Sequence, residues 1–212
     1  MAEEIIEQSY RELADTILEH NPGVDLGRVR AAFELADRAH SGQKRKAGTP
    51  YVTHCVAAAQ ICAEMGLDED SIVAALLHDC IEDTAITHED IARQFGGEVA
   101  DIVEGVTKLT RVQFTSREDE QMENLRKMLM AMAKDIRVIL IKIADRLHNM
   151  RTMEYMVAQK QLEKSLETME IYAPIAHRLG LQKVKWELED LSLKYLDPDG
   201  YREIITYLDS KA

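Results

Sequence analysis

The stretch Leu76–Asp83, which reads LLHDCIED, places four ionisable side chains within one of the most apolar segments of the chain. Burying a charge costs several kcal/mol unless the group is paired or bound to a metal. At about 100° per residue, His78, Asp79, Glu82 and Asp83 fall within one arc of a helix. The stretch therefore predicts a buried helix whose polar side chains face a single metal site.

Length and composition limit what this site can belong to. The chain has 212 residues, of which 46% are hydrophobic and 30% charged, with only 4 prolines and 10 glycines. These values are typical of a globular, helical protein with a substantial core. The formal net charge of -12 argues against a surface that coats nucleic acid or binds an anionic membrane. A small anionic substrate fits only if basic residues are concentrated locally.

The cysteines and the first residues indicate the compartment. Cys55, Cys62 and Cys80 lie inside apolar runs without CxxC spacing, so we expect reduced core residues. The first seven residues lack the basic and apolar regions of a signal peptide, and no stretch is long and apolar enough to span a bilayer. The expected location is the cytoplasm.

Apolar periodicity along the chain predicts an all-α fold. The run after Asp135 is rich in β-branched residues, but its length and the spacing of its polar residues favour a helix over a strand. Asp25, Asp68 or Asp70, and Thr87 with Asp90 are expected to cap helices. The predicted helices cover residues 3–20, 25–40, 51–65, 72–81, 88–95, 98–109, 135–151, 157–179 with an interruption at Pro174, and 182–196, followed by a short polar segment at 201–208.

Two segments between these helices have distinctive compositions. Residues 110–120 are polar and predict a mobile loop beside the site. Met128, Met130 and Met132 form a stripe that we interpret as core filling rather than a ligand set.

The sequence Lys44-Arg45-Lys46 is the densest basic cluster in this acidic chain. A basic triplet in a loop is often only a solvated turn. Its position between two helices and shortly before His54 favours a contact to phosphate or to a base. Arginine suits bidentate phosphate binding and stacking on a flat base, whereas lysine acts as a point charge.

Four residues from three predicted helices form the candidate metal site. A lone histidine near the start of a helix is more often structural than a ligand. His54 is therefore a candidate ligand only in combination with its partners. Two imidazoles and two carboxylates suit Mn, Fe, Zn or Ni rather than Ca. The spacing also places Asn149 and Thr152 on one helix face with the last of the four. The four candidate ligands are His54, His78, Asp79 and Asp145.

The ordered series His, His-Asp, Asp on apolar helices resembles the HD superfamily of metal-dependent phosphohydrolases, which is an all-α fold. Longer motifs resemble the RelA/SpoT family and occur in order along nearly the whole chain. They are RKAGTPYVTH at 45–54, AALLHDCIEDT at 74–84, FGGEV at 95–99, GVTKL at 105–109, NLRKM at 124–128, ADRLHNMRT at 144–152 and IYAPIAHRLG at 171–180.

This resemblance implies an alarmone hydrolase domain, which removes pyrophosphate from the 3′ position of (p)ppGpp with Mn²⁺ and returns GDP or GTP. It implies that His54, His78, Asp79 and Asp145 bind the metal, and that Glu82 and Asp83 orient or deprotonate the attacking water. Family members that have lost hydrolysis depart from the His-Asp-x-x-Glu-Asp motif, which this chain keeps. Arg45 and Lys46 match residues that flank the guanine. Asn149, with Thr152 on the same face, is expected to contact the nucleotide.

The resemblance also suggests a domain organisation. We expect a hydrolase domain at 1–196 and a linker-like segment at 197–212. Residues 186–196 resemble the helix that leads into the synthetase half of the long family members. The chain is then a fragment of a longer protein with a synthetase domain in cis, or a stand-alone hydrolase.

Two rival functions remain open at this point. Another HD nucleotidase, acting on 5′-monophosphates or dNTPs, would keep the metal residues but would not require the basic loop or the Glu-Asp pair. A regulatory domain could bind the alarmone without cleaving it, although the intact ligand set argues against this. The expected partner is a small nucleotide, with no nucleic acid and no membrane.

Overall fold

The structure is a computed structural model that describes residues 2–110, 126, 130 and 134–211. The predicted loop at 110–120 lies outside these residues except for its first position, as do Met128 and Met132. Met130 is described and is 57% exposed, so its predicted role in the core is wrong.

The described residues form helices joined by turns and loops and contain no β-strand, apart from one isolated bridge between Lys44 and Pro50. This confirms the all-α prediction, including a helix rather than a strand after Asp135. In chain order the elements are α1 (Ala2–His20), α2 (Leu26–Ala39), α3 (Val52–Glu64), α4 (Glu69–Leu77), α5 (Cys80–Asp83), α6 (His88–Phe95), α7 (Gly97–Thr110), α9 (Ile136–Arg151), η1 (Met153–Tyr155), α10 (Ala158–Glu167), η2 (Thr168–Tyr172), α11 (Ala173–Arg178), α12 (Gln182–Leu196) and α13 (Pro198–Asp209).

Side-chain caps set several helix starts, as the sequence predicted. The Asp25 carboxylate accepts from the backbone N–H of Gly27, and Asp68 accepts from that of Ser71. Thr87 and Asp90 form a complete capping box at the start of α6. Each cap satisfies backbone donors that have no partner within the helix.

The stretch 76–83 is not one continuous helix, which corrects the prediction. Helix α4 ends at Leu77, and α5 begins at Cys80. At the junction the backbone N–H of His78 reaches only the Ala75 carbonyl, three residues back and 3.5 Å away. The His78 side chain competes for the same oxygen, with Nδ1 at 2.7 Å. This competition weakens the regular ladder, so His78 and Asp79 lie at a junction between two helices, although their backbone angles stay in the right-handed helical region.

The interruption predicted at Pro174 takes the form of a π-helical segment. Residues 158–178 are helical throughout, but Thr168–Tyr172 adopts the wider π geometry directly before α11. A proline inside a helix clashes with the carbonyl four residues earlier, and local widening relieves the clash. Beyond Asp197, which caps α13 by accepting from Gly200 N, the predicted short segment is a helix of 12 residues.

The chain divides into two compact units, residues 1–145 and 146–212. The boundary lies within α9. The predicted division into a hydrolase domain at 1–196 and a linker-like segment at 197–212 stays a prediction.

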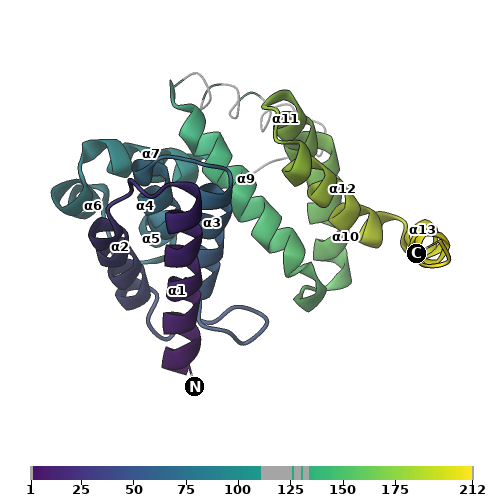
Figure 1. Cartoon of the computed structure of the whole chain (residues 1–212), viewed down its shortest axis with the longest axis horizontal. Coiled ribbons are helices and arrows are strands. Elements are labelled where there is room, and N and C mark those ends of the chain that lie inside the picture. Colours follow the sequence, from purple (N-terminus) through teal and green to yellow (C-terminus); the bar gives the residue numbers. More distant parts are fainter. Residues whose placement is uncertain (1, 111–125, 127–129, 131–133, 212) are drawn as a thin grey trace. The chain divides into compact units, whose positions relative to one another are not determined.

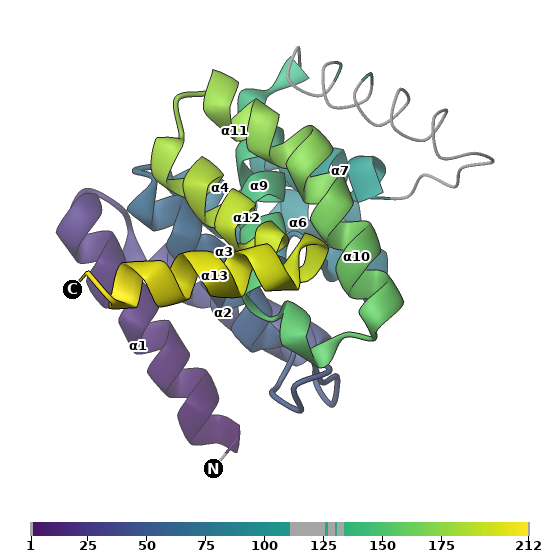
Figure 2. The ribbon, with the colours of Figure 1, turned by 90° about the vertical axis from the view of Figure 1, so that its right-hand side faces the viewer.

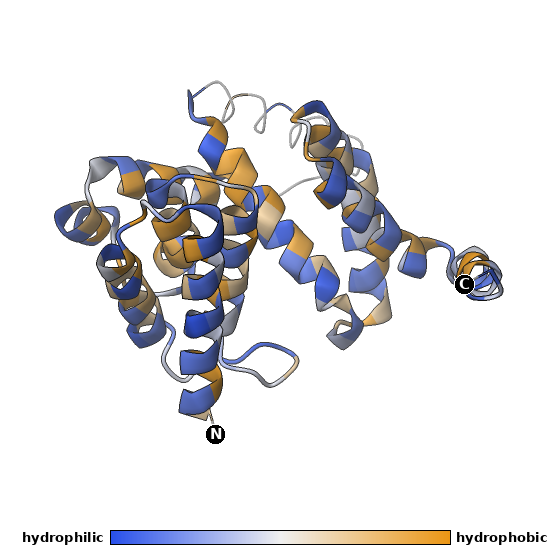
Figure 3. Ribbon diagram, viewed as in Figure 1, coloured by the Kyte–Doolittle hydropathy of each residue, from blue (hydrophilic) through white to orange (hydrophobic). Residues whose placement is uncertain are grey.

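In the first unit, α3 packs between α1 and α4, and α4 also packs against α2 and α7 (Figure 1). Hydrophilic residues cover much of α1, and its buried positions are Leu13 and Ile17 (Figure 3). Helix α4 is buried at every position from Ser71 to Leu77. A Cβ at Gly105 of α7 would meet a Val138 methyl group at 2.8 Å, so only glycine lets α7 and α9 approach this closely. The three cysteines are free and buried, as predicted.

In the second unit, α12 packs against α10 and α11 (Figure 2). The buried Arg146 guanidinium lies 4.3 Å from the ring centroid of Tyr172 and donates to Glu167 at 2.9 Å. These contacts connect the C-terminal half of α9 to the π-helical segment η2 and to the end of α10. Across the part of the chain that the structure describes, no helix combines the length and the apolar character needed to cross a bilayer.

Candidate metal and hydrolytic site

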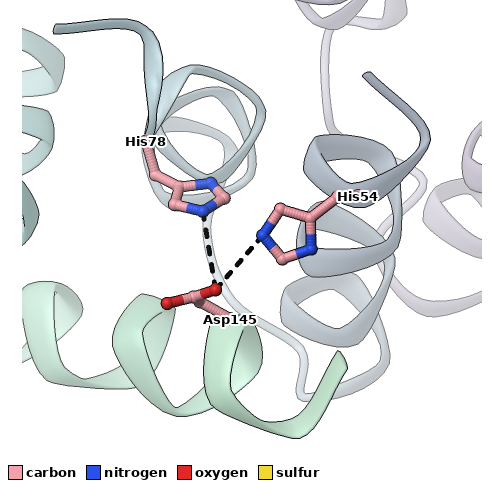
Figure 4. A group of neighbouring side chains, drawn as sticks. All are labelled: His54, His78 and Asp145. Atoms are coloured by element: carbon pink, nitrogen blue, oxygen red, sulfur yellow. Dashed lines mark ion pairs between the residues drawn. The ribbon is translucent and has the colours of Figure 1, made fainter. Parts of the chain in front are cut away.

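Three buried side chains from separate helices converge at the candidate metal site. His54 comes from the first turn of α3, His78 from the end of α4 and Asp145 from α9 (Figure 4). Asp145 Oδ1 lies 3.1 Å from His54 Nε2 and 3.9 Å from His78 Nε2. The three side chains are 1%, 0% and 8% exposed, so their polar atoms are shielded from water.

Asp79 brings a fourth donor to the same place. Its Oδ2 lies 3.1 Å from His78 Nε2 and 3.6 Å from His54 Nε2. The four residues that the sequence singled out as ligands are therefore brought together. We call them the metal cluster: His54, His78, Asp79 and Asp145. Their role as ligands stays a prediction.

The arrangement of His78 tests whether a metal ion fits. Its Nδ1 must donate at 2.7 Å, because its partner, the Ala75 carbonyl, can only accept. Its Nε2 is buried and has no well-formed hydrogen bond among the described residues, although two carboxylates lie within 3.9 Å. Metal-binding histidines usually donate one ring N–H to a carbonyl or carboxylate and use the other nitrogen as the ligand. The residues present therefore fit a divalent transition metal.

Each carboxylate of the cluster is held by a donor that the sequence analysis missed. The Lys142 ammonium donates to Asp145 Oδ2 at 2.7 Å, and the Tyr51 hydroxyl donates to Asp79 Oδ2 at 2.7 Å. Lys142 could have been recognised as a cation in an apolar run, one turn before Asp145. No comparable spacing linked Tyr51 to Asp79, because the two are brought together only by the packing of α3 against α4.

Burial and mutual charge shift the pKa values in the cluster. Burial raises the pKa of Asp145, but Lys142 and the two histidines outweigh it and hold the pKa well below its usual range. Burial likewise opposes ionisation of Asp79, and His78 more than compensates, so its pKa is also lowered. Both carboxylates are therefore ionised at neutral pH and ready to bind a cation.

The two histidines respond to this environment in opposite ways. Burial lowers the pKa of His54, and its hydrogen bond to Asp145 only partly offsets the effect. Burial also disfavours the charged form of His78, but Asp79 and Asp145 outweigh it and raise its pKa to about 9. We infer that a metal ion binding at neutral pH displaces a proton from His78.

The predicted acidic pair lies on α5, one turn beyond the junction. Glu82 is half-buried and Asp83 is exposed. Asp83 Oδ2 lies 3.4 Å from the Tyr51 hydroxyl, and its backbone carbonyl accepts from Gln43 Nε2 at 3.1 Å. The pair therefore reaches solvent, whereas His54, His78 and Asp145 are buried.

The basic loop before α3 is a tight turn. Arg45 N donates to the Thr49 carbonyl at 2.9 Å, and Gly48, at φ +84°, closes the turn in the left-handed conformation that glycine adopts without strain. The Arg45 guanidinium lies 5.8 Å from the ring centroid of Tyr51, and Lys46 is exposed. This places Arg45 near the side chain that contacts Asp79 and Asp83.

Asn149 and Thr152 belong to the second unit, which the structure does not place relative to the metal cluster. Asn149 is half-buried in the last turn of α9, and the Thr152 hydroxyl donates to the His148 carbonyl at 3.1 Å. Their predicted contact with a nucleotide stays a prediction.

Comparison with known proteins yields consistent matches. The family model described as HD domain matches residues 32–182. The chain is 51% identical over 194 residues to a probable GTP pyrophosphokinase from Mycobacterium leprae, covering 92% of this chain and 24% of that protein. It is 50% identical over 197 residues to the bifunctional (p)ppGpp synthase/hydrolase SpoT from Escherichia coli K12, covering 93% of this chain and 28% of that protein.

A solved structure is also similar. Described as a metazoan ortholog of SpoT that hydrolyses ppGpp, it matches with a TM-score of 0.57 and 27% identity, covering 79% of this chain and 91% of that one. The chain therefore spans about a quarter of the length of the curated relatives cited above, and most of the length of this structural neighbour.

Proposed function

Because the chain belongs to the HD domain family, we propose that it is a metal-dependent hydrolase that removes the 3′-pyrophosphate of ppGpp or pppGpp. The products are GDP or GTP and pyrophosphate, and the proposed ion is Mn²⁺. One observation carries the proposal: two imidazoles and two ionised carboxylates converge in a buried cluster, with a partly exposed acidic pair one turn beyond it. The names of the E. coli relative and of the metazoan structure support this choice of substrate.

His54, His78, Asp79 and Asp145 would hold the ion. A divalent ion bound there would lower the pKa of water and neutralise charge on the phosphoryl oxygens. The chain prepares the site by keeping both carboxylates ionised through Lys142 and the histidines. Because these groups are already in place, little reorganisation is needed when the ion binds.

Glu82 and Asp83 would handle the proton of the attacking water. Attack of water on the phosphorus next to the ribose breaks its bond to the 3′ oxygen, so a nearby base must accept a proton from the water while the leaving 3′ oxygen gains one to become the hydroxyl of the product. Both side chains reach solvent, so a water molecule can approach them, and the proton that they accept can return to the 3′ oxygen directly or through solvent. Their position on α5, directly after Asp79, keeps them close to the cluster.

Arg45 and Lys46 would bind the nucleotide. The chain carries a net charge of -12, so a polyanionic substrate needs a local concentration of positive charge. Arg45 also offers a flat guanidinium for stacking on guanine. Asn149 and Thr152 complete the proposed nucleotide contacts, and a synthetase domain in the same polypeptide is proposed by analogy with the bifunctional E. coli relative.

The decisive experiment incubates the protein with ppGpp and Mn²⁺ and separates the nucleotides by anion exchange. We expect GDP and pyrophosphate in equal amounts, and no reaction after chelation of the metal. A parallel panel of dNTPs and 5′-monophosphates should stay intact. Cleavage of the panel but not of ppGpp would replace the proposal with a general HD nucleotidase, and tight ppGpp binding without cleavage would replace it with a sensor domain.

A further inference from the structure

We propose that Tyr51 is a positioning residue for this hydrolysis, which fixes the proposed ligand Asp79 and leaves Asp83 able to turn toward water. This inference rests on the proposed function for its catalytic consequence, but its structural part concerns the metal cluster alone. Tyr51 was not among the residues that the sequence analysis singled out.

The hydroxyl of Tyr51 contacts the oxygen of Asp79 that faces the cluster. It donates to Asp79 Oδ2 at 2.7 Å, and the same oxygen lies 3.1 Å from His78 Nε2. A carboxylate oxygen carries two lone pairs, so it can accept from Tyr51 and still offer one pair to a cation. A tyrosine hydroxyl is protonated at neutral pH, so it acts as the donor in this contact.

The same hydroxyl lies 3.4 Å from Asp83 Oδ2. It has one proton and can donate to only one carboxylate at a time, and the shorter contact favours Asp79. Asp83 is therefore the carboxylate that can turn toward water while Asp79 stays fixed. Tyr51 thus gives the two carboxylates different roles. Asp79 is held in place for the ion, and Asp83 can turn to accept a proton.

The ring of Tyr51 is held on several sides. It stacks on His40, with ring centroids 4.7 Å apart, and meets His54 edge-on at 5.7 Å. His40 is buried and lies 2.9 Å from Gln43 Oε1 through its Nδ1, while Gln43 also binds the Asp83 carbonyl. These contacts leave the phenol little freedom, so its hydroxyl can fix Asp79 at a low entropic cost.

Arg45 lies on the ring that carries this hydroxyl, at 5.8 Å from its centroid. The phenyl ring and the hydroxyl therefore have separable roles. The hydroxyl holds Asp79 and lies beside Asp83, whereas the ring lies against Arg45, the residue proposed to bind guanine.

Tyr51→Phe removes the hydroxyl and keeps the ring, so it tests the first role alone. We expect Mn²⁺ affinity to fall about tenfold, since changes to groups that orient metal ligands typically cost 10–100-fold. Affinity is measured by electron paramagnetic resonance of free Mn²⁺ during titration. We expect kcat for ppGpp to fall at saturating Mn²⁺, with KM within about twofold of wild type because the ring under Arg45 is retained.

Tyr10→Phe is the matched control, because its hydroxyl contacts only the Leu26 carbonyl, at 3.4 Å, among the interactions described. It should leave both Mn²⁺ affinity and kcat unchanged. Equal Mn²⁺ affinity in Tyr51→Phe and wild type would overturn the proposal. So would a loss of affinity accompanied by a fall in the melting temperature of the metal-free protein, since a general loosening would then explain it. If wild type binds Mn²⁺ but does not cleave ppGpp, the proposed function fails, and the Mn²⁺ titration still decides the role of Tyr51.

Discussion

The metal cluster and the residues around it differ in their exposure to solvent. As whole residues, His54, His78 and Asp145 are 1%, 1% and 5% exposed, and Asp79 is half-buried. The outer residues, which we call the rim, lie on the basic loop before α3 and on the short helix α5. The rim consists of Arg45, Lys46, Glu82 and Asp83, which are half-buried or exposed.

This difference in exposure matches the two tasks proposed for the site. Groups that bind an ion must keep their charge and position, and burial with fixed partners such as Lys142 achieves both. Groups that meet a substrate and exchange protons with water need access to solvent. If this is correct, changes in the cluster should abolish binding of the ion, and changes in the rim should alter single kinetic constants.

The largest effect is expected from Asp79→Ala or Asp145→Ala. Either change removes a proposed ligand, so Mn²⁺ binding should be lost and ppGpp hydrolysis should fall by at least about 10³-fold, because the ion supplies several kcal/mol of charge stabilisation. Asp145→Ala should also lower the free energy of unfolding by about 3 kcal/mol, since it deprives the buried Lys142 of its carboxylate. Calorimetric Mn²⁺ titration and denaturant unfolding measure both effects.

Asp101→Ala is the control for this pair, because Asp101 is 75% exposed and pairs only with His88 among the ion pairs described. It should bind Mn²⁺ as wild type does. Retained Mn²⁺ binding in Asp79→Ala would remove that residue from the ligand set.

The next effect is expected from Glu82→Gln, which keeps the size of a rim side chain but removes its basicity. We expect kcat to fall about 10²–10⁴-fold, the usual contribution of general acid-base catalysis, while Mn²⁺ stays bound. Steady-state hydrolysis at saturating Mn²⁺ provides the measurement. Glu89→Gln, on the exposed start of α6, serves as a control. Near wild-type turnover in Glu82→Gln would contradict the role given to the acidic pair.

The pH dependence of Mn²⁺ affinity probes the cluster without mutation. The pKa of His78 is raised to about 9, so below that pH the ion must displace a proton. Affinity should therefore rise with pH, by about tenfold per unit between pH 7 and 9, and level off above. Titrations in buffers of different ionisation enthalpy report the released proton directly. An affinity that does not change over this range would show that His78 is already neutral in the free protein.

The smallest effect is expected from Arg45→Ala. Losing a stacking and charged contact at the rim typically costs about 1–2 kcal/mol, so KM for ppGpp should rise about tenfold with little change in kcat or Mn²⁺ affinity. Arg93→Ala is the control, because the Arg93 side chain on α6 is 78% exposed. An unchanged KM in Arg45→Ala would count against its contact with guanine.

Local patterns in the sequence predicted much of the fold correctly. The caps at Asp25, Asp68 and Thr87 and the helix after Asp135 follow from short-range rules, because a cap or a helical period involves only residues a few positions apart. The candidate ligands were recognised for a related reason. Ionisable side chains are costly to bury, so they are conspicuous wherever they interrupt an apolar segment of the sequence.

Two predictions were wrong, the continuous helix at 76–83 and the buried position of Met130, and each depends on contacts that sequence periodicity does not report. The helix break at His78 depends on a side chain that competes for the Ala75 carbonyl, which periodicity cannot reveal. The exposure of Met130 depends on what packs against it, and a methionine stripe alone does not determine that.

The sequence alone predicts the all-α architecture and the four candidate ligands, since both follow from local spacing and residue chemistry, and the family resemblance adds the role expected of the acidic pair. The tertiary structure was needed to show that each imidazole of the cluster lies within 3.9 Å of both carboxylates, and that Lys142 and Tyr51 each hold one of those carboxylates. The reason is that such contacts join residues far apart in the chain. The distance between Tyr51 and Asp79 is set by the packing of α3 on α4, and no property of either residue alone specifies it.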